Sequence, residues 1–146
     1  AASDVYKRQP LNKDEKYLRI QVRKLIEELQ KKGFDQKKLN VTIKNLKHSN
    51  NVVNHYVNEN IKKNTFFSKK KRRMILKNEY FNQPFEVIFR SLSESIKLIG
   101  ERSYPVRGKK LDNIISKIKD NCLYKVTLGG CIIEKVNETL IISKEH

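Results

Sequence analysis

Apolar residues recur at three- and four-residue steps through the first part of the chain, which is the spacing of amphipathic helices. The first such stripe predicts a helix over residues 13–32, which Asn12 can cap and Gly33 can end. Asp35 can cap a second, longer helix, whose stripe is interrupted by the polar Asn50. The two stripes predict the seam of a helical hairpin. They consist of Leu18, Val22, Leu25 and Leu29, and of Leu39, Ile43, Leu46, Val53 and Val57.

The pattern changes near residue 64, where NTFFSKKKRRMIL is interpreted as a linker entering an extended strand. Pro84 then marks the start of an apolar-faced helix that ends at Gly100, and a short helix follows Pro105. Three β-rich runs finish the chain, with Gly129-Gly130 and Asn137-Glu138 as the turns between them. The runs are LYKVTL, CIIEKV and TLIIS.

These elements predict an α+β fold: an amino-terminal helical hairpin followed by a small α/β unit that ends in an antiparallel β meander. We place the helical hairpin in residues 10–63 and the carboxy-terminal α+β region in residues 64–146. Residues 1–9, AASDVYKRQ, show no amphipathic period and are interpreted as a non-native cloning or assembly junction. On this interpretation the native sequence begins at Pro10, after a domain that has been cut away.

The charge of the chain favours a polyanionic partner. The formal net charge is +16 at pH 7, from 32 Lys plus Arg against 16 Asp plus Glu. The sequence has no run of about 18 apolar residues and no secretory leader pattern, so we expect nucleic acid in the cytoplasm rather than a membrane.

The basic residues form two groups that can contact RNA. Five consecutive basic residues, Lys69, Lys70, Lys71, Arg72 and Arg73, follow Phe66 and Phe67, so phosphate contacts and base stacking are both chemically available. The alternative is a solvated linker whose phenylalanines belong to the core. The second group lies at the predicted hairpin turn and consists of Lys31, Lys32, Lys37 and Lys38.

No complete catalytic or metal-binding set is found in the sequence. His48 and His55 share a helix face without a third partner and are interpreted as solvated. Cys122 and Cys131 have no CxxC pair and are expected to be free thiols in a reducing compartment. The five glycines form no phosphate-binding loop, so we expect this chain to bind no cofactor and no metal.

Two segments resemble the tRNA(Ile)-lysidine synthetase family. In the segment PLNKDEKYLRIQVRKLIEEL, Pro10, Asn12, Arg19 and Arg23 match the run and helix that follow the family's catalytic domain, although Leu11 replaces the usual Ser or Thr. The carboxy-terminal half resembles the α-proteobacterial branch of the family. The residues that carry this second match are Pro84, Glu86, Arg90, Tyr104, Pro105, Arg107, Leu111, Thr127, Leu128, Gly129, Gly130 and Cys131.

The resemblance implies an ATP-dependent carbon-nitrogen ligase that joins lysine to the wobble cytidine of an isoleucine tRNA. In the family, ATP, with magnesium, binds an amino-terminal SGGxDS-bearing domain, which is absent from this sequence. The chain would then supply the tRNA-binding part, with Arg19 and Arg23 at the junction with the catalytic domain, and would be inactive alone. The partners implied are tRNA, lysine and ATP.

Two other classes of protein remain open at this point. One is a free-standing basic RNA- or ribosome-binding module without catalytic activity. The other is a structural protein that forms a homo-oligomer through the seam from Leu39 to Val57.

Overall fold

The computed structural model describes the backbone of residues 2–146 and the side chains of residues 14–146. The chain divides into two compact units, residues 1–48 and residues 49–146, and each is described here by itself. The division falls inside the second helix, whereas the sequence pattern changes character near residue 64.

The first unit contains α1 (Ala2–Lys31) and the first turns of α2 (Gln36–Asn64). Gly33 lies between them with a φ of 91°, and the Asp35 carboxylate accepts a 2.9 Å hydrogen bond from the Lys37 amide, so both predicted helix boundaries are confirmed. The predicted start of the first helix is wrong. Asn12 lies inside α1 because the helix continues upstream to Ala2, so the amides that Asn12 was expected to cap have helical carbonyl acceptors upstream.

The apolar stripes of the first unit are exposed. Every described side chain from residue 14 to residue 52 is exposed, including Leu18 (60%) and Leu46 (64%). The two helices and their connecting turn were predicted, but the packed seam between them is not present in this chain by itself. Helical periodicity defines the apolar face of a helix and does not define what covers that face.

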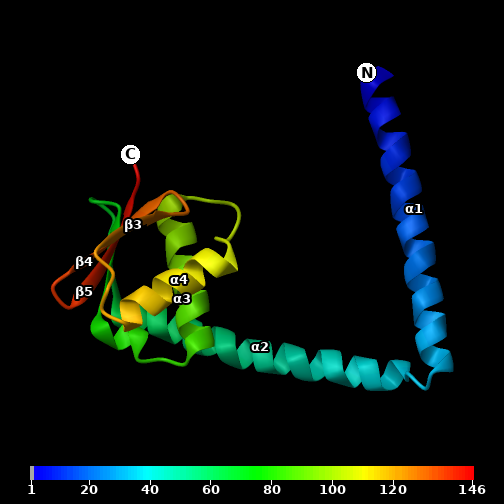
Figure 1. Cartoon of the computed structure of the whole chain (residues 1–146), viewed down its shortest axis with the longest axis horizontal. Coiled ribbons are helices and arrows are strands. Elements are labelled where there is room, and N and C mark those ends of the chain that lie inside the picture. The colour runs from blue at the N-terminus through cyan, green and yellow to red at the C-terminus, as the bar shows by residue number, and fades with distance from the viewer. Residues whose placement is uncertain (1) are drawn as a thin grey trace. The chain divides into compact units, whose positions relative to one another are not determined.

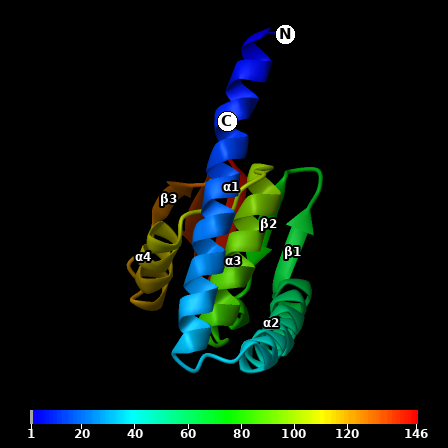
Figure 2. The same ribbon diagram turned by 90° about the vertical axis from the view of Figure 1, so that its right-hand side faces the viewer.

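The second unit is a five-stranded antiparallel sheet with helices on one face (Figures 1 and 2). The strand order is β1-β2-β5-β4-β3, so the predicted carboxy-terminal meander is one side of a larger sheet. The α+β class is therefore confirmed. The strands are β1 (Thr65–Ser68), β2 (Arg73–Leu76), β3 (Lys125–Leu128), β4 (Cys131–Val136) and β5 (Thr139–Lys144).

Two helices cover one face of this sheet, α3 (Phe85–Gly100) and α4 (Gly108–Lys119), and a short 3-10 helix, η1 (Asn78–Phe81), precedes them. Pro84 directly precedes α3, and the helix ends at Gly100, as the sequence predicted. Both helices are amphipathic, and their apolar faces form the core against the inward side chains of the strands. The core includes Met74, Leu76, Ile88, Leu92, Ile96, Leu111, Ile115, Ile133 and Ile142.

The predicted linker into an extended strand is confirmed in its second part, because β2 is that strand, and is wrong in its first part. Residues 65–68 form β1, which pairs with β2 in the register Phe66 to Ile75 and Phe67 to Met74. The basic run is the turn of this β-hairpin, and Arg73 begins β2. The short strand β1 is stabilised by its pairing with β2 rather than by the strand propensity of its own four residues, since strand stability depends on pairing and burial.

A buried polar network joins α2 to α3. The Asn60 side-chain amide donates to the Tyr80 carbonyl oxygen and to the Ser91 hydroxyl, both at 3.2 Å. The hydroxyls of Tyr80 and Ser95 lie 3.1 Å apart, and Ser95 donates to the Ser91 carbonyl oxygen at 2.8 Å. Burial raises the pKa of Tyr80 far above its ordinary value. Within the second unit, the network fixes the last turns of α2 to η1 and α3.

Candidate nucleic-acid interface

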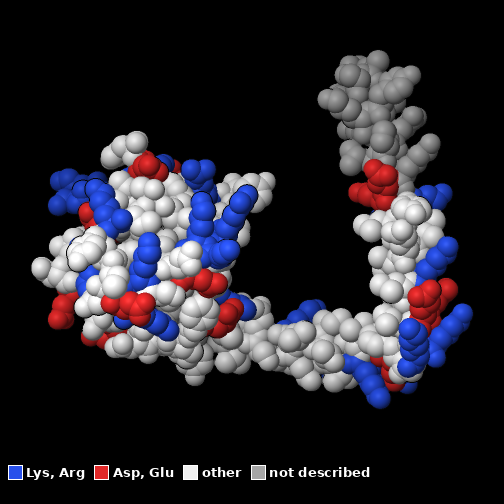
Figure 3. Space-filling view, viewed as in Figure 1, with Lys and Arg blue, Asp and Glu red and all other residues white. Residues whose placement is uncertain are grey.

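The basic run lies on an exposed β-turn at the edge of the sheet. Residues 69–72 form the turn between β1 and β2, and the Arg72 amide donates to the Lys69 carbonyl oxygen at 3.4 Å. All five basic side chains from Lys69 to Arg73 are exposed. Figure 3 shows basic side chains gathered at the upper left corner of the second unit, where Figure 1 places this turn. A turn of this kind can reach a phosphate backbone without rearranging the core.

The two phenylalanines before the turn lie outside the core. Successive residues of a strand point to opposite faces, so Phe66 lies beside Ile75 on the uncovered face and Phe67 lies beside Met74 on the helix side. Their exposed fractions are 64% for Phe66 and 41% for Phe67. The alternative in which both rings belong to the core is therefore wrong. At least the Phe66 ring is available for stacking on a base.

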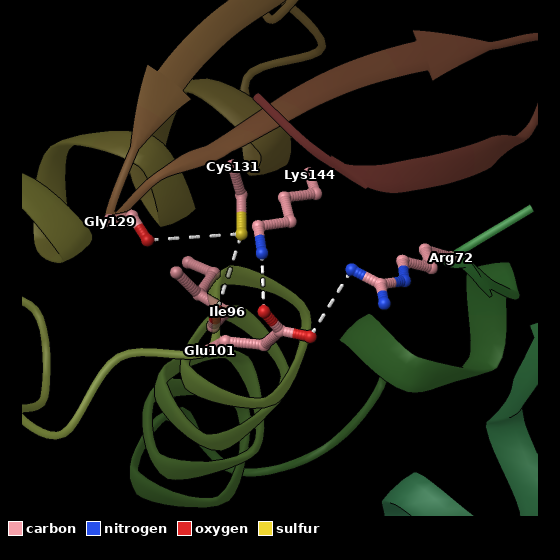
Figure 4. Close-up of polar contacts among 6 residues, drawn as sticks. All are labelled: Arg72, Ile96, Glu101, Gly129, Cys131 and Lys144. Carbon is pink, nitrogen blue, oxygen red and sulfur yellow. Dashed lines mark hydrogen bonds and ion pairs between the residues drawn. The ribbon is translucent and has the colours of Figure 1, made fainter. Parts of the chain in front are cut away.

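One carboxylate restrains the turn. Glu101 follows the end of α3 in the left-handed conformation, with a φ of 51°. Its side chain contacts the Lys144 ammonium group and lies 3.5 Å from the Arg72 guanidinium group (Figure 4). The hydrogen bond and positive charge of Lys144, together with Arg72, lower the pKa of Glu101 below its ordinary value. Arg72 is thus held toward α3, and Lys69, Lys70, Lys71 and Arg73 make no ion pair among the described residues.

The candidate residues of the first unit are exposed on its helices. Arg19 and Arg23 lie one turn apart on α1, and no ion pair within the described part of the chain includes either of them. The lysines of the connecting turn, Lys31, Lys32, Lys37 and Lys38, are exposed as well. These residues belong to the first unit, and the β1–β2 turn belongs to the second unit.

Part of this chain is similar in sequence to part of a known protein. A stretch of 70 residues in this chain is 36% identical to a tRNA(Ile)-lysidine synthase from Wolbachia sp. subsp. Brugia malayi (strain TRS). The stretch is 47% of this chain and 16% of the relative, so the chain matches only a small part of that protein. No family model matches the chain, and no solved structure matches it. The chain is therefore related in sequence to part of a tRNA(Ile)-lysidine synthase.

Three residues of the carboxy-terminal resemblance have structural roles. Gly129 and Gly130 form the turn between β3 and β4 with φ values of 61° and 77°, which favour glycine. The Cys131 thiol is buried and donates to the Ile96 carbonyl oxygen at 3.3 Å (Figure 4). Burial raises the pKa of Cys131 to about 11, so the thiol is protonated at neutral pH. These residues support the packing of the sheet on α3.

Sequence reasoning missed the role of Arg90. Its guanidinium group donates to Glu86 at 2.7 Å on the same helix and also to the side chains of Asn50 and Asn54 on α2. Asn50 was interpreted as a polar interruption of a seam, and it instead contacts α3. The resemblance did single out Glu86 and Arg90, but periodicity gives no indication of which distant helix an arginine will reach.

The described side chains form no metal-binding cluster. No group of three or more His, Cys, Asp and Glu side chains among them could hold a metal ion. His48 and His55 are exposed, as predicted. Among the helices described, none is both long enough and apolar enough to cross a membrane.

Proposed function

We propose that this chain is the tRNA-binding part of a tRNA(Ile)-lysidine synthetase, a ligase that joins lysine to the wobble cytidine of an isoleucine tRNA with ATP. The matched stretch of the Wolbachia protein supports this proposal, as do the motifs at both ends of the chain. ATP and magnesium would bind in the amino-terminal catalytic domain of the enzyme. Without that domain the chain releases no AMP from ATP, lysine and tRNA.

The observation that carries the RNA-binding role is the exposed basic β1–β2 turn next to Phe66. Charge density of this kind neutralises phosphates and releases condensed counterions, which is the main source of affinity for nucleic acids. The net charge of +16 extends the attraction over the molecule. The lysines between α1 and α2 would add a second contact region of the same character.

Arg19 and Arg23 would contribute at the junction with the catalytic domain. Both are exposed and their guanidinium groups present planar, bidentate donors suited to phosphate or carboxylate groups. Replacing both with alanine in the full-length enzyme should lower the single-turnover rate of lysidine formation and leave the circular dichroism spectrum unchanged. Glu27→Ala and Glu28→Ala on the same helix are the matched control. Equal rates in the two variants would show that the two arginines have no role at the junction.

The second candidate function is a free-standing RNA- or ribosome-binding module in the cytoplasm. It is favoured by the core within residues 49–146, which is formed by residues of that unit alone. Measurement of AMP release in a longer protein separates the two candidates. A gene that encodes an SGGxDS-bearing domain in the same reading frame, and whose product forms lysidine, supports the ligase.

The RNA-binding role is tested by the salt dependence of tRNA affinity, measured by anisotropy at several salt concentrations. Replacing the five residues from Lys69 to Arg73 with serine should weaken binding to every tRNA about equally. It should also reduce the log-log salt slope by ~0.7–0.9 for each lost phosphate contact. The control replaces five exposed lysines that belong to other elements: Lys44, Lys47, Lys109, Lys110 and Lys117. Equal slopes in the two variants would show that the turn makes no special contact.

A further inference from the structure

A pocket of about 430 Å³ lies on the second unit, between η1, the end of α4 and the turn from β4 to β5. Its polar lining residues include three asparagines, Asn78, Asn82 and Asn121, and two lysines, Lys119 and Lys135. The apolar part of the lining comes from Phe81, Ile118, Leu123 and Leu140. The volume lies within the range of ligand sites, ~300–1,000 Å³.

The lining has the chemistry that recognises a nucleotide. An asparagine amide both donates and accepts hydrogen bonds, so it can pair with the edge of a base that presents adjacent donors and acceptors. An aromatic ring such as Phe81 offers a stacking surface for the base. The ammonium groups of Lys119 and Lys135 can neutralise a phosphate. Base, stacking and phosphate contacts are thus available in a single cavity.

Neighbouring contacts hold the pocket in shape. The Phe81 ring packs edge-on against the buried Tyr80 ring, with the two centroids 5.0 Å apart. Asn121 adopts a left-handed φ of 60° after α4, and its backbone amide donates to the Ile118 carbonyl oxygen at 3.1 Å. The Lys135 ammonium group donates to the Asn121 side-chain oxygen. A preorganised wall costs less ordering entropy when a ligand binds.

The charge of the pocket favours a single phosphodiester. Lys119 and Lys135 together with Glu138 give a formal charge of +1, from two lysines and one glutamate. A phosphodiester in an RNA strand carries one negative charge, whereas a free nucleoside triphosphate carries several and is usually held by a glycine-rich loop, which this sequence lacks.

We propose that this pocket binds one unpaired nucleotide of an RNA strand. The base would contact Phe81 and the asparagine side chains, and the phosphate would contact the two lysines. The inference rests on the proposed RNA-binding function and adds a second kind of contact to it. The β1–β2 turn supplies affinity that is insensitive to sequence, while a base in this pocket would supply discrimination between nucleotides.

The test is a nuclear magnetic resonance titration of the whole chain, labelled with ¹⁵N. Separate titrations use a single-stranded RNA tetranucleotide of each base, the four nucleoside monophosphates, and inorganic phosphate. Both nucleotide series should shift the amides around Asn78, Asn82 and Asn121, and inorganic phosphate should leave the base-contacting amides unchanged. The double variant with Asn78→Ala and Asn82→Ala should bind the preferred tetranucleotide about fivefold or more weakly, since two hydrogen bonds are lost.

The control variant carries Asn51→Ala and Asn113→Ala, which replace exposed asparagines outside the pocket and should leave affinity unchanged. Shifts confined to Lys69–Arg73 would overturn the pocket and leave RNA binding by the turn intact. Shifts with monophosphates but not with tetranucleotides would overturn an RNA strand as the occupant, and shifts with phosphate alone would reduce the pocket to an anion site. No shift with any RNA would overturn the proposed function as well.

Discussion

At the residue scale, Gly100 shows how closely α3 approaches the turn between β3 and β4. A β-carbon placed on Gly100 would lie 2.3 Å from the Gly129 carbonyl oxygen and 3.2 Å from the Cys131 sulfur atom. The backbone oxygen cannot move aside as the end of a flexible side chain can. The absence of a side chain at this one position therefore lets the last turn of α3 pack against the turn between β3 and β4.

Gly100→Ala should lower the free energy of unfolding by about 1–3 kcal/mol, since overpacking forces the backbone apart. Gly108→Ala is the matched control. Its β-carbon would meet only the Phe89 ring at 3.6 Å, and alanine is the better helix former, so little change or a small gain in stability is expected. Urea denaturation of the two variants provides the measurement. Equal midpoints would contradict the close approach of Gly100 and Gly129.

The two cysteines should differ in reactivity. Cys122 is exposed and Cys131 is buried, with its pKa raised to about 11. A thiol reagent at pH 8 should therefore modify one thiol in the native chain and two in denaturant, and Cys122→Ser should abolish the native reaction.

The raised pKa of Cys131 also means that this thiol ionises at a lower pH in the unfolded chain than in the folded chain. The contribution of the Cys131 thiol to the free energy of unfolding should therefore be fully present below pH ~8.5 and should be lost as the pH rises toward about 11.

At the element scale, the connection between α2 and α3 depends on Asn60. This residue is 3% exposed, and besides its two donated hydrogen bonds its side-chain oxygen accepts from the Asn64 amide group at 2.8 Å. Removing the side chain would leave the Tyr80 carbonyl oxygen and the Ser91 hydroxyl without this donor in a buried environment. An unsatisfied buried polar group costs more than the net value of the hydrogen bond that is lost.

Asn60→Ala should destabilise the chain by about 1–3 kcal/mol for each buried group left unpaired. Asn58→Ala, an exposed position on the same helix, should change stability by less than about 0.5 kcal/mol. Thermal unfolding followed by circular dichroism would compare them. A similar loss in both variants would show that helix propensity, rather than the buried network, determines the effect.

At the scale of the whole molecule, the buried residues are concentrated in one part of the described chain, and the helical residues before that part are exposed. All of the buried residues among those described lie between Val57 and Ile142. The side chains of residues 14–52 are exposed, so α1 and the first turns of α2 have no core of their own in the described part. Isolated helices in water are marginally stable, because most helical stability comes from tertiary packing.

Hydrogen exchange should therefore be slow in the strands and in α3 and α4, and fast in residues 14–48. Mass spectrometry of peptides after timed labelling would resolve the two regions. Strong protection of residues 14–48 that increases with protein concentration would contradict this expectation. It would support instead the association of copies through the stripe that includes Leu39 and Leu46.

Several features of the fold follow from local sequence alone. Gly33, Asp35 and Pro84 define helix ends because each has a conformational or capping property that acts over a few residues. The glycine pair at residues 129–130 likewise defines a hairpin turn. The apolar faces of α3 and α4 follow from periodicity. The basic run of the candidate interface is equally visible in the sequence.

Other features were decided only by tertiary structure. Strand β1 was not predicted because it exists through pairing with β2, which in turn pairs with β5 almost 70 residues along the chain. The burial of Asn60 and the exposure of Phe66 depend on neighbours that no local window contains. The pocket beside Phe81 is assembled from three distant segments. The sequence by itself determined where helices end and where charge is concentrated, because these are short-range properties. Tertiary structure decided which polar groups are buried and which surfaces meet, because strand pairing and packing join residues that are remote in the chain.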